Sequence, residues 1–409
     1  MTPRIAVVHE RFTEYGGSEA VVAEFLKIWP SAPVFAPIAT PECLAAVSAA
    51  AASDHRVRVG DPARPGAAAS AADSVACGGL GGGSPDPAGF SFHTTWLSRA
   101  HALGGGRSHA PLLPFVPDTL RRLPLDPTVD AVVVSHHAFA TQAAHATEAP
   151  VVAYVHSPAR WAWDPAFRAR EAGGRAGQFA LAALGLLARR CELRAAPRLA
   201  RVVANSRAVA ERIDDWWGLP ATVVPPPVRI DRFAPDPAVA REDFFLFAGR
   251  LVPYKRPDLA IRAARRAGCR LVVVGDGRFR TQLEALAGTE TTFLGAAPDE
   301  VLLDAYRRCR ALLMPGVEDF GIVPVEAMAC GTPVLAVGAG GALDTVRPGS
   351  TGELLEFADD ETLVTEFARA MREFDPAAYD PATVRAHAES YSPAAFRTRI
   401  ASIVTDVLA

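Results

Sequence analysis

Lysine is almost absent from this 409-residue sequence. Of its 42 basic residues only Lys27 and Lys255 are lysine, which leaves 40 arginines. An ammonium group is a compact point charge, whereas a guanidinium is a flat fork, so the two suit different contacts with phosphate. We expect Lys255, which lies in a loop described below, to be retained for its chemistry, and Lys27, near the end of a predicted helix, to have no such role.

Other kinds of segment are missing as well. No apolar run reaches about 18 residues, so no membrane span is predicted. The chain enters an apolar strand, IAVVH, without a basic leader, so we expect no export signal and a cytoplasmic protein. The six cysteines show no C-x-x-C spacing and are expected to be free thiols in a reducing compartment. A net charge of -3 argues against nucleic acid as a partner.

Short apolar runs alternate with amphipathic stretches, which is typical of βαβ units and parallel sheets. Strands are predicted in the first half at residues 4–9, 33–36, 130–135, 151–155 and 201–204, and in the second at 222–225, 244–248, 270–274, 291–294, 311–314 and 333–337. Helices are predicted at 257–267, 279–287, 299–308 and 323–330, and a long amphipathic stretch at about 166–197. The pattern predicts an α/β protein with two doubly wound, Rossmann-like domains, for which the length suffices.

The prolines between residues 217 and 230 would interrupt any helix and mark the predicted seam between the domains. The sequence therefore predicts an N-terminal domain over 1–217 and a C-terminal domain over 218–390. A last helix within 391–409 is expected to pack back on the first domain. Residues 46–90 are rich in Ala, Gly, Pro and Ser and are predicted to be a flexible insertion.

The most informative stretch is PGVEDFGIVPVEAMACGTPVLAVGAGGALDTV, residues 315–346. It holds two glutamates eight apart, Glu318 and Glu326, the second on a short helix that Pro324 would start and Gly331 would end. A strand and a glycine loop follow. Carboxylates here can meet sugar or ribose hydroxyls, while amides at helix starts can face a diphosphate. The stretch indicates a nucleotide-sugar site.

A second candidate loop follows the strand near residue 246, in FLFAGRLVPYKRPDLAI. Arg250 and Lys255 fall there just before a helix, where cations oppose the helix dipole unless an anion is nearby. Two cations at this position suit a diphosphate leaving group, whose charge grows as its bond to the sugar breaks. Arg256 is interpreted as a solvated residue.

Glycines at the ends of other predicted strands suggest further contacts. Gly16 and Gly17 follow the first strand and would let the backbone approach a ligand, with Ser18 capping the next helix. Gly275, in VVVGDGR, is interpreted as a tight turn that admits the nucleotide. Leu294 lies in FLGAAPDE, residues 293–300, which ends the following strand and whose backbone could pair with the base edge.

Histidines end several predicted strands. His156, in VVAYVHSPARWAWD, would point toward the sugar, although a lone histidine is more often structural. His136 and His137 could help to bind an acceptor, and His9 is interpreted as structural.

An arginine-rich amphipathic stretch lies between residues 160 and 201, with nine arginines against three acids around FALAALGLLA. Such a stretch can lie on an anionic membrane. The alternative is a helix packed on its own domain with a solvated arginine face.

Taken together, the motifs resemble the family 4 retaining glycosyltransferases of the GT-B architecture, in which two Rossmann-like domains face an interdomain cleft. The matching signatures are GGSE at 16–19, HSP at 156–158, ANS at 204–206, PPPV at 225–228, GRLVPYKR at 249–256, GDG at 275–277 and EDFGIVPVEAMACGTPV at 318–334. The wording SHH, HSPARWAWD and EDFGIVPVEA is most similar to the O-antigen and exopolysaccharide mannosyltransferase branch.

The resemblance implies roles for individual residues. Arg250 and Lys255 would hold the donor diphosphate, and Glu326 would bind the ribose hydroxyls. Glu318 would lie by the transferred sugar, and His156 would contact the far hydroxyls of that sugar. The remaining donor contacts would come from Gly16, Gly17, Gly275, Leu294, Phe320, Gly321, Ile322 and Val323. Retention in this family is thought to proceed on one face of the sugar, with the diphosphate accepting the proton of the acceptor.

The expected function is therefore transfer of a hexose, mannose favoured, from a GDP- or UDP-linked donor to a lipid-linked or small glycosidic acceptor. No metal is expected, since D-x-D triplets are absent from the sequence, and no cofactor beyond the donor is implied. Peripheral association with the inner membrane face is a further expectation. The alternatives are a sugar-nucleotide epimerase of the same fold and a relative that binds nucleotide sugars without turnover.

Overall fold

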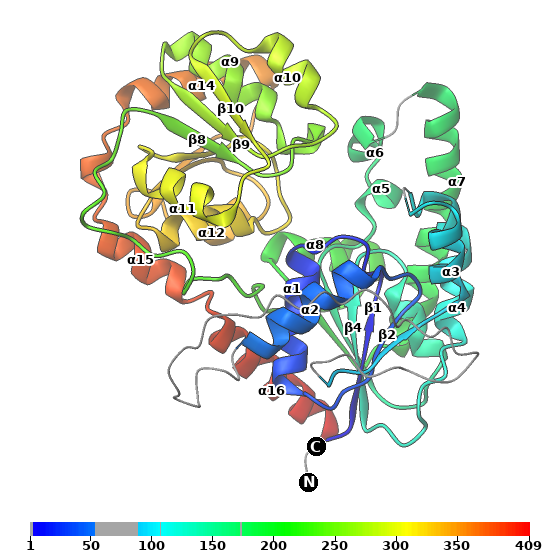
Figure 1. Cartoon of the computed structure of the whole chain (residues 1–409). Helices are drawn as coiled ribbons and strands as arrows, with labels where there is room; N and C mark the ends of the chain where they lie inside the picture. Colours follow the sequence, from blue (N-terminus) through cyan, green and yellow to red (C-terminus); the bar gives the residue numbers. More distant parts are fainter. Residues whose placement is uncertain (1–2, 54–88, 107, 172–173) are drawn as a thin grey trace, which may run out of the picture. The chain divides into compact units, whose positions relative to one another are not determined.

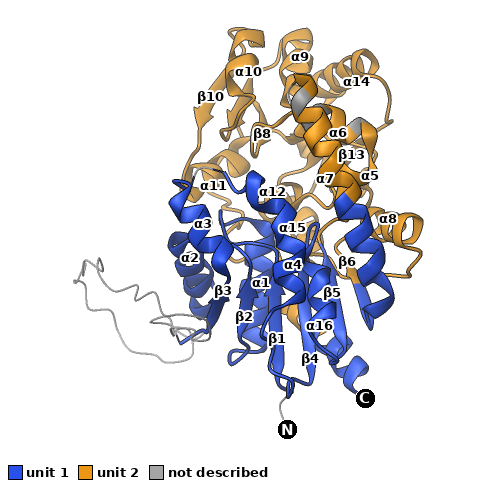
Figure 2. Ribbon diagram, turned by 90° about the vertical axis from the view of Figure 1, so that its right-hand side faces the viewer, with its two compact units in different colours: residues 1–155, 187–202, 400–409 blue, residues 156–186, 203–399 orange. Residues whose placement is uncertain are grey.

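The structure is a computed structural model that describes residues 3–53, 89–106, 108–171 and 174–409 (Figure 1). Its contacts divide the chain into two compact units (Figure 2). Unit 1 comprises residues 1–155, 187–202 and 400–409, and unit 2 comprises 156–186 and 203–399. The predicted seam at 217/218 remains a prediction. The predicted insertion 46–90 begins inside a helix, α2 (Pro41–Ala52), and its residues 54–88 lie outside the described part of the chain.

The first sheet has seven strands in the order β3-β2-β1-β4-β5-β6-β7. They are β1 (Ile5–His9), β2 (Val34–Ala36), β3 (Phe92–Thr94), β4 (Ala131–His136), β5 (Val151–Val155), β6 (Arg201–Ala204) and β7 (Thr222–Val223). The prediction that residues 222–225 begin the second series of strands is wrong, because β7 pairs parallel to β6. The other helices of this half of the chain are α1 (Gly17–Ile28), α3 (Trp96–Leu103), α4 (Val116–Arg121), α5 (Arg160–Trp163), α6 (Pro165–Glu171), α7 (Gly174–Ala195) and α8 (Arg207–Trp217), and the last helix of the chain is α16 (Pro393–Leu408).

The second sheet has six strands in the order β10-β9-β8-β11-β12-β13. They are β8 (Phe245–Ala248), β9 (Leu271–Val274), β10 (Thr291–Gly295), β11 (Leu312–Met314), β12 (Val334–Val337) and β13 (Gly352–Leu355). The helices are α9 (Pro257–Ala267), α10 (Arg280–Leu286), α11 (Asp299–Arg308), α12 (Ile322–Ala329), α13 (Ala342–Thr345), α14 (Asp360–Glu373) and α15 (Pro381–Glu389). Figure 1 shows α9, α10 and α14 over one face of this sheet and α11, α12 and α15 over the other. The order of its strands reverses between β8 and β11, and ligands of doubly wound sheets bind outside the carboxyl ends of strands at such a point.

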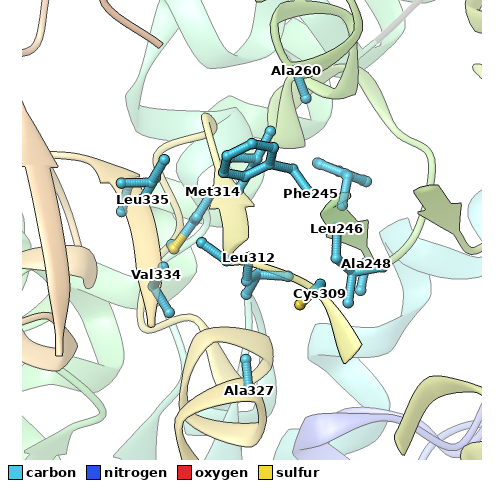
Figure 3. Packing of buried hydrophobic residues seen from close by; sticks show 14 of the residues in the cluster. Phe245, Leu246, Ala248, Ala260, Cys309, Leu312, Met314, Ala327, Val334 and Leu335 are labelled. Carbon is cyan, nitrogen blue, oxygen red and sulfur yellow. The ribbon is translucent and has the colours of Figure 1, made fainter. Parts of the chain in front are cut away.

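The core of unit 2 explains why these elements form. Strand β8 is buried along its whole length, and Phe245, Leu246, Leu312 and Val334 pack together in the sheet (Figure 3). Unbroken apolar runs of this kind are typical of parallel strands covered on both faces. The predicted α/β fold with two doubly wound domains is confirmed in both sheets.

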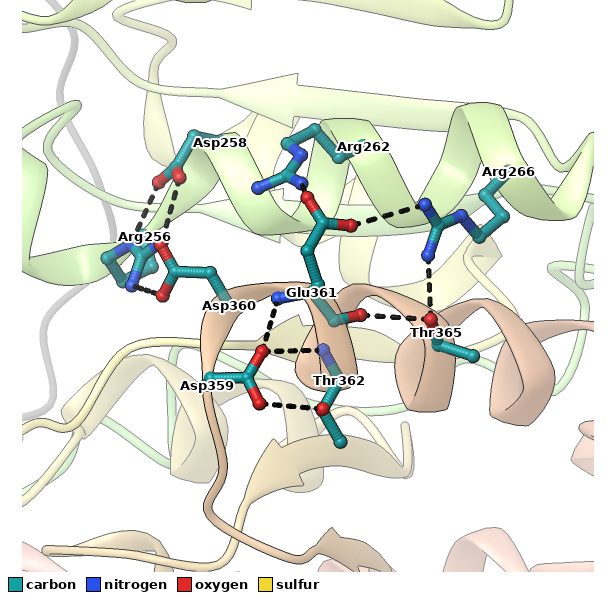
Figure 4. Close-up of polar contacts among 9 residues, drawn as sticks. All are labelled: Arg256, Asp258, Arg262, Arg266, Asp359, Asp360, Glu361, Thr362 and Thr365. Atoms are coloured by element: carbon teal, nitrogen blue, oxygen red, sulfur yellow. Dashed lines mark hydrogen bonds and ion pairs between the residues drawn. The ribbon is translucent and has the colours of Figure 1, made fainter.

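Helix α9 begins and ends as its sequence predicts, at Pro257 and before a left-handed Gly268. The interpretation of Arg256 as a solvated residue is wrong. Its side chain is 12% exposed and pairs with Asp258 at 3.0 Å and with Asp360 of α14 at 2.7 Å (Figure 4). Although burial lowers the pKa of Arg256, its hydrogen bonds to Asp360 and Asp258 raise it overall. Arg256 thus ties the start of α9 to α14, beside the loop that carries Lys255.

Candidate functional site

The site predicted in the second half lies at the C-terminal edge of the second sheet. The short 3-10 turn Pro253–Lys255 follows β8 and places Lys255, whose side chain is 10% exposed, inside this edge. The Nζ atom of Lys255 lies 2.6 Å from Oε1 of Glu318, which follows β11. Because parallel strands end at the same edge, residues 63 positions apart meet here.

The charges around Lys255 keep it protonated. Burial lowers the pKa of Lys255, but the carboxylate of Glu318 raises it above its usual value overall. The charge of Arg250 opposes this rise. Arg250 itself is exposed. The two predicted diphosphate ligands therefore share one electrostatic environment, with Lys255 inside and Arg250 at the surface.

A small cavity between the strand ends and the start of α12 lies beside Lys255 and Glu318. It is lined by Phe247, Ala248, Lys255, Met314, Glu318, Val323 and Pro324, among other residues. Val323 and Ile322 are half-buried in the first turn of α12, which begins after Gly321. Gly321 has a left-handed φ of 88°, which favours glycine. The helix begins at Ile322, two residues before the Pro324 predicted to start it, and the left-handed Gly331 after its end is confirmed.

Glycines hold the loop of Lys255 against its neighbours. A Cβ on Gly275 would lie 1.9 Å from the carbonyl oxygen of Gly249, and one on Gly316 would lie 2.6 Å from that of Lys255. Hydrogen bonds run from Gly249 N to Val274 O at 3.0 Å and from Leu251 N to Asp276 O at 2.9 Å. The predicted role of Gly275 in admitting a nucleotide remains a prediction, but the side that its missing side chain would occupy is filled by backbone.

The glycine loop after β12 supports Glu318 in the same way. Gly341 N donates to the carbonyl oxygen of Glu318 at 2.9 Å. A Cβ on Gly341 would lie 2.2 Å from the carbonyl oxygen of Phe320. Gly340 has a left-handed φ of 61°. The segment that carries Glu318, Phe320 and Gly321 is therefore held by backbone contacts with this glycine loop.

The second glutamate of the motif lies deeper. Glu326 is 7% exposed, and its Oε2 accepts a hydrogen bond from the Tyr306 hydroxyl at 3.2 Å. Its Oε1 lies 3.8 Å from Nη2 of Arg229. Burial raises the pKa of Glu326 to about 7, although Arg229 and Tyr306 act in the opposite direction. Leu294, at the end of β10, is 46% exposed.

His156 follows β5 and is 9% exposed. The side-chain amide of Asn205, in the ANS signature, donates to the backbone oxygen of His156 at 2.7 Å. This bond fixes the backbone at the end of the strand, so the structure accounts for the Asn205 signature without a direct ligand contact.

In unit 1 the loop before α1 differs from the prediction. Gly16 and Gly17 are exposed, but α1 begins at Gly17, so Ser18 lies within its first turn and is not the cap. The side chain of Glu19 stabilises the start of the helix instead, because its Oε2 accepts hydrogen bonds from Gly16 N at 3.0 Å and from Ser18 Oγ at 2.9 Å. A carboxylate three residues on satisfies two donors, whereas a serine would satisfy one.

Glu19 also belongs to a buried network that the sequence analysis missed. Its Oε1 lies 3.1 Å from Nε2 of His9, and Nδ1 of His9 lies 3.0 Å from Ser135 Oγ. Burial raises the pKa of Glu19, but the hydrogen bond with His9 and the charge of His9 lower it overall to about 2. His9 is 0% exposed, which agrees with the structural role expected for it.

The role proposed for His136 in acceptor binding is wrong, because its side chain is completely buried. Thr141 N donates to Nδ1 of His136 at 3.3 Å, so Nε2 carries the proton and points to Glu192 at 3.2 Å. Glu192 is equally buried. Glu10 was also missed: its carboxylate accepts the backbone amides that start the 3-10 helix Ala140–His145, including Ala140 N at 2.8 Å.

Within residues 3–53, 89–106, 108–171 and 174–409, no group of three His, Cys, Asp or Glu side chains is arranged to hold a metal ion. Among the helices so described, none is long and apolar enough to cross a membrane.

Two family models match adjoining parts of the chain. Residues 43–232 match Glycosyltransferase Family 4, and residues 230–378 match Glycosyl transferases group 1. Together they extend over residues 43–378.

Curated relatives match part of the chain. A D-inositol 3-phosphate glycosyltransferase of Nocardia farcinica is 34% identical over 38% of this chain and 41% of its own length. The protein of that name from Thermobispora bispora is 31% identical over 51% of this chain and 56% of its own length. The chain thus spans about half the length of these relatives.

Solved structures match over nearly the whole chain. Anabaena HepE in complex with UDP and glucose has a TM-score of 0.66 at 18% identity, covering 98% of this chain and 100% of that chain. Sucrose-phosphate synthase from Thermosynechococcus elongatus has a TM-score of 0.64 at 18% identity, covering 99% of each. At this identity the likeness shows the fold alone.

Proposed function

The chain belongs to the GT-B glycosyltransferases, since glycosyltransferase models match both halves of it, and from this premise we propose that it transfers a hexose from a nucleoside diphosphate donor to an acceptor hydroxyl. The observation that carries the proposal is the cluster at the C-terminal edge of the second sheet. There Lys255 and Arg250 supply positive charge. The carboxylate of Glu318 beside Lys255 can accept hydrogen bonds, and Glu326 lies buried on α12.

In this proposal the donor diphosphate lies against Lys255 and Arg250. As the bond between the anomeric carbon and the diphosphate oxygen breaks, negative charge grows on the phosphate, and nearby cations stabilise that charge more than they stabilise the bound donor. The acceptor oxygen forms its bond on the same face of the sugar, and its proton passes to the departing phosphate oxygen. The configuration at the anomeric carbon is then retained.

Glu318 has a second role in this arrangement. Its carboxylate lies next to Lys255 and can accept hydrogen bonds from sugar hydroxyls. A sugar held there sits beside the diphosphate position, which is the geometry that transfer needs. Glu326, 7% exposed and with one oxygen held by Tyr306, would accept hydrogen bonds from the ribose.

We propose a GDP- or UDP-linked hexose as the donor. Resemblance of the motifs favours mannose, while Anabaena HepE, which shares the fold, forms a complex with UDP and glucose. For the acceptor, a lipid-linked or small glycosidic hydroxyl is the first proposal. The name of the curated relatives supports a second, a phosphorylated polyol such as an inositol phosphate.

Two alternatives make different predictions. An epimerase of the same fold would interconvert nucleotide sugars without an acceptor. A relative without turnover would bind nucleotide sugars and release them unchanged. A relative that has lost turnover would be expected to lack some of the site residues, and Arg250, Lys255, Glu318 and Glu326 are all present.

The test is a panel of GDP- and UDP-hexoses with two acceptor classes, a lipid-linked saccharide and an inositol phosphate, followed by mass spectrometry of the products. A preferred donor should first raise the melting temperature of the protein by mass action. A product that carries the hexose in retained configuration supports the proposal. If no donor stabilises the protein and none is consumed, the proposal is wrong.

We also propose that the protein associates with a membrane surface, where a lipid-linked acceptor would be found. Helix α7 exposes Phe179 at 77%, Leu186 at 58% and Leu193 at 48%. Residues seven apart fall on one side of a helix, and Arg190 lies exposed on the same side. Glu192, the acidic residue of α7, is buried against His136. An apolar stripe with positive charge suits an anionic lipid surface.

A further inference from the structure

Three side chains form a closed group with the buried carboxylate of Glu326. The Tyr306 hydroxyl donates to Oε2 of Glu326 at 3.2 Å, and the ring of Tyr306 packs edge-on against Phe233 with the ring centres 5.5 Å apart. The guanidinium of Arg229 lies 5.3 Å from the centre of the Phe233 ring. Its Nη2 lies 3.8 Å from Oε1 of Glu326, which completes the group.

Arg229 is held from the outside as well. Asp299, at the start of α11, accepts from Nη1 of Arg229 at 2.8 Å and from Nη2 at 3.4 Å. Asp299 also accepts from Arg232 at 3.1 Å. The Arg229 side chain is 50% exposed, yet Phe233 and Asp299 hold its guanidinium beside Glu326.

The two oxygens of Glu326 differ in their surroundings. Oε2 is occupied by the Tyr306 hydroxyl at hydrogen-bonding distance, whereas Arg229 is 3.8 Å from Oε1 and beyond a hydrogen bond. A carboxylate oxygen has two acceptor sites, so Oε1 can accept from a ligand hydroxyl while Arg229 stays beside it. Only the ionised carboxyl group presents both oxygens purely as acceptors.

The charge on Glu326 depends on its neighbours. Burial disfavours ionisation and raises the pKa to about 7, while Arg229, Tyr306 and Lys255 favour the ionised form and Asp299 disfavours it. Arg229 is the largest of the favourable influences. Without its positive charge, the balance among these groups moves toward the protonated acid.

We propose that Arg229 is a positioning residue that keeps Glu326 ready to accept hydrogen bonds from the donor's ribose hydroxyls, with Asp299 and Phe233 holding Arg229 in place. This inference rests on the proposed function, because it takes the ligand of Glu326 to be the ribose of a nucleoside diphosphate. Arg229 itself makes no contact with the ribose in this account. It acts through the carboxylate, so its effect should appear only where a ribose hydroxyl is present.

The experiment compares ribose with deoxyribose ligands. Binding of UDP and 2′-deoxy-UDP, and of GDP and 2′-deoxy-GDP, is measured by calorimetry at about one pH unit below and one above the carboxyl pKa. The proteins are the wild type, Arg229→Met, the conservative Arg229→Lys, and Arg308→Met as a matched control. Arg308 is an exposed arginine that pairs with Asp304 at 2.8 Å on α11.

We expect the wild type and Arg308→Met to prefer the ribonucleotide by about tenfold, the effect of one hydrogen bond to a charged group. Arg229→Met should lose this preference at the lower pH and regain part of it at the higher pH, where the carboxyl group ionises without help. Its affinity for the 2′-deoxynucleotide, which keeps only the 3′-hydroxyl, should fall less than its affinity for the ribonucleotide. Arg229→Lys, which keeps the charge, should retain most of the preference.

Each other result overturns the inference in a distinct way. If Arg229→Met keeps the wild-type preference at both pH values, Arg229 does not act through Glu326. If it weakens ribo- and deoxynucleotides equally, Arg229 contacts the ligand elsewhere or supports the fold. If the wild type binds both nucleotides without preference, Glu326 is not a ribose ligand, although nucleotide binding stands. If the wild type binds neither nucleotide, the proposed function and this inference fail together.

Discussion

The ammonium group of Lys255 lies 2.6 Å from the carboxylate of Glu318, so the cation expected to hold a diphosphate is already paired with the carboxylate expected beside the sugar. The pair lies at the end of β8 and β11, with side chains 10% and 19% exposed. A donor that binds here must share Lys255 with Glu318. Both residues should therefore affect turnover, and each should affect the stability of the other.

Lys255→Met and Glu318→Gln should each lower kcat by about a hundredfold, the scale of losing one charge contact in a transition state. Initial rates with the preferred donor would measure this, with Arg308→Met as the control. Near-normal rates in a variant with a wild-type circular dichroism spectrum would refute that residue's role.

The stability of the same variants should not be additive. Lys255→Met leaves a mostly buried carboxylate without its cation and should lower the free energy of unfolding by about 3 kcal/mol. Adding Glu318→Gln removes the stranded charge and should recover about half of that loss. Urea unfolding of the two single variants and the double variant tests this. Strict additivity would mean that the two side chains do not interact in solution.

Glu326 should make the ligand-free protein less stable as the pH rises. Its pKa is raised from 4.5 to about 7 in the folded state, so between these values the unfolded chain loses a proton that the folded protein keeps. Stability falls across this window by about 3 kcal/mol and levels off above pH 7. The difference between wild type and Glu326→Gln, followed by thermal unfolding against pH, isolates the contribution. A difference that does not vary with pH would contradict it.

Gly275→Ala should destabilise unit 2 far more than Gly268→Ala. Both glycines have positive φ, at 136° and 69°, but a Cβ on Gly275 would lie 1.9 Å from the Gly249 carbonyl, whereas nothing lies within 4 Å of one on Gly268. We expect the free energy of unfolding to fall by about 1 kcal/mol for Gly268→Ala, because of its left-handed backbone, and by at least about 3 kcal/mol for Gly275→Ala. Equal losses in urea unfolding would show that the contact with Gly249 relaxes easily.

Substituting the exposed stripe of α7 should weaken binding to vesicles that contain anionic lipid. Phe179→Ser with Leu186→Ser removes the largest apolar contacts, and sedimentation with phosphatidylglycerol vesicles should show at least about a tenfold loss. Phe357→Ser is the control, since Phe357 is 62% exposed outside α7. If the wild type does not sediment with vesicles, α7 is not a membrane surface. If the control falls equally, the effect is not specific to α7.

The sequence was sufficient for elements whose apolar pattern is unbroken. Strand β8, with four consecutive buried residues, and α9, bounded by Pro257 and Gly268, lie where they were predicted. Strand β13 was missed because Gly352 and Glu353 interrupt its apolar pattern. Strand β7 was assigned to the wrong sheet, since two residues carry no information about the strand that they pair with.

For the site, the sequence singled out Lys255, Arg250, Glu318 and Glu326 but could not give their mutual contacts. Side-chain pairing across 63 residues depends on strand order, which local patterns do not encode. For the same reason Arg229 received no attention: its importance comes from Phe233 and Asp299, which lie beside it only in the fold. The prediction of Ser18 as the cap of α1 is wrong because the N-cap is Gly16, two residues earlier than expected.

The backbone contacts of Gly275, Gly277 and Gly316 restrict how this protein can change. Cβ atoms at these positions would meet the carbonyl oxygens of Gly249, Leu251 and Lys255 at 1.9, 2.4 and 2.6 Å. A change in donor preference must therefore come from partly exposed side chains such as Arg229 and Leu294, because the backbone around these three glycines cannot be altered without a clash. Mutant libraries that seek activity with a new nucleotide sugar should therefore vary such exposed side chains and leave the three glycines unchanged.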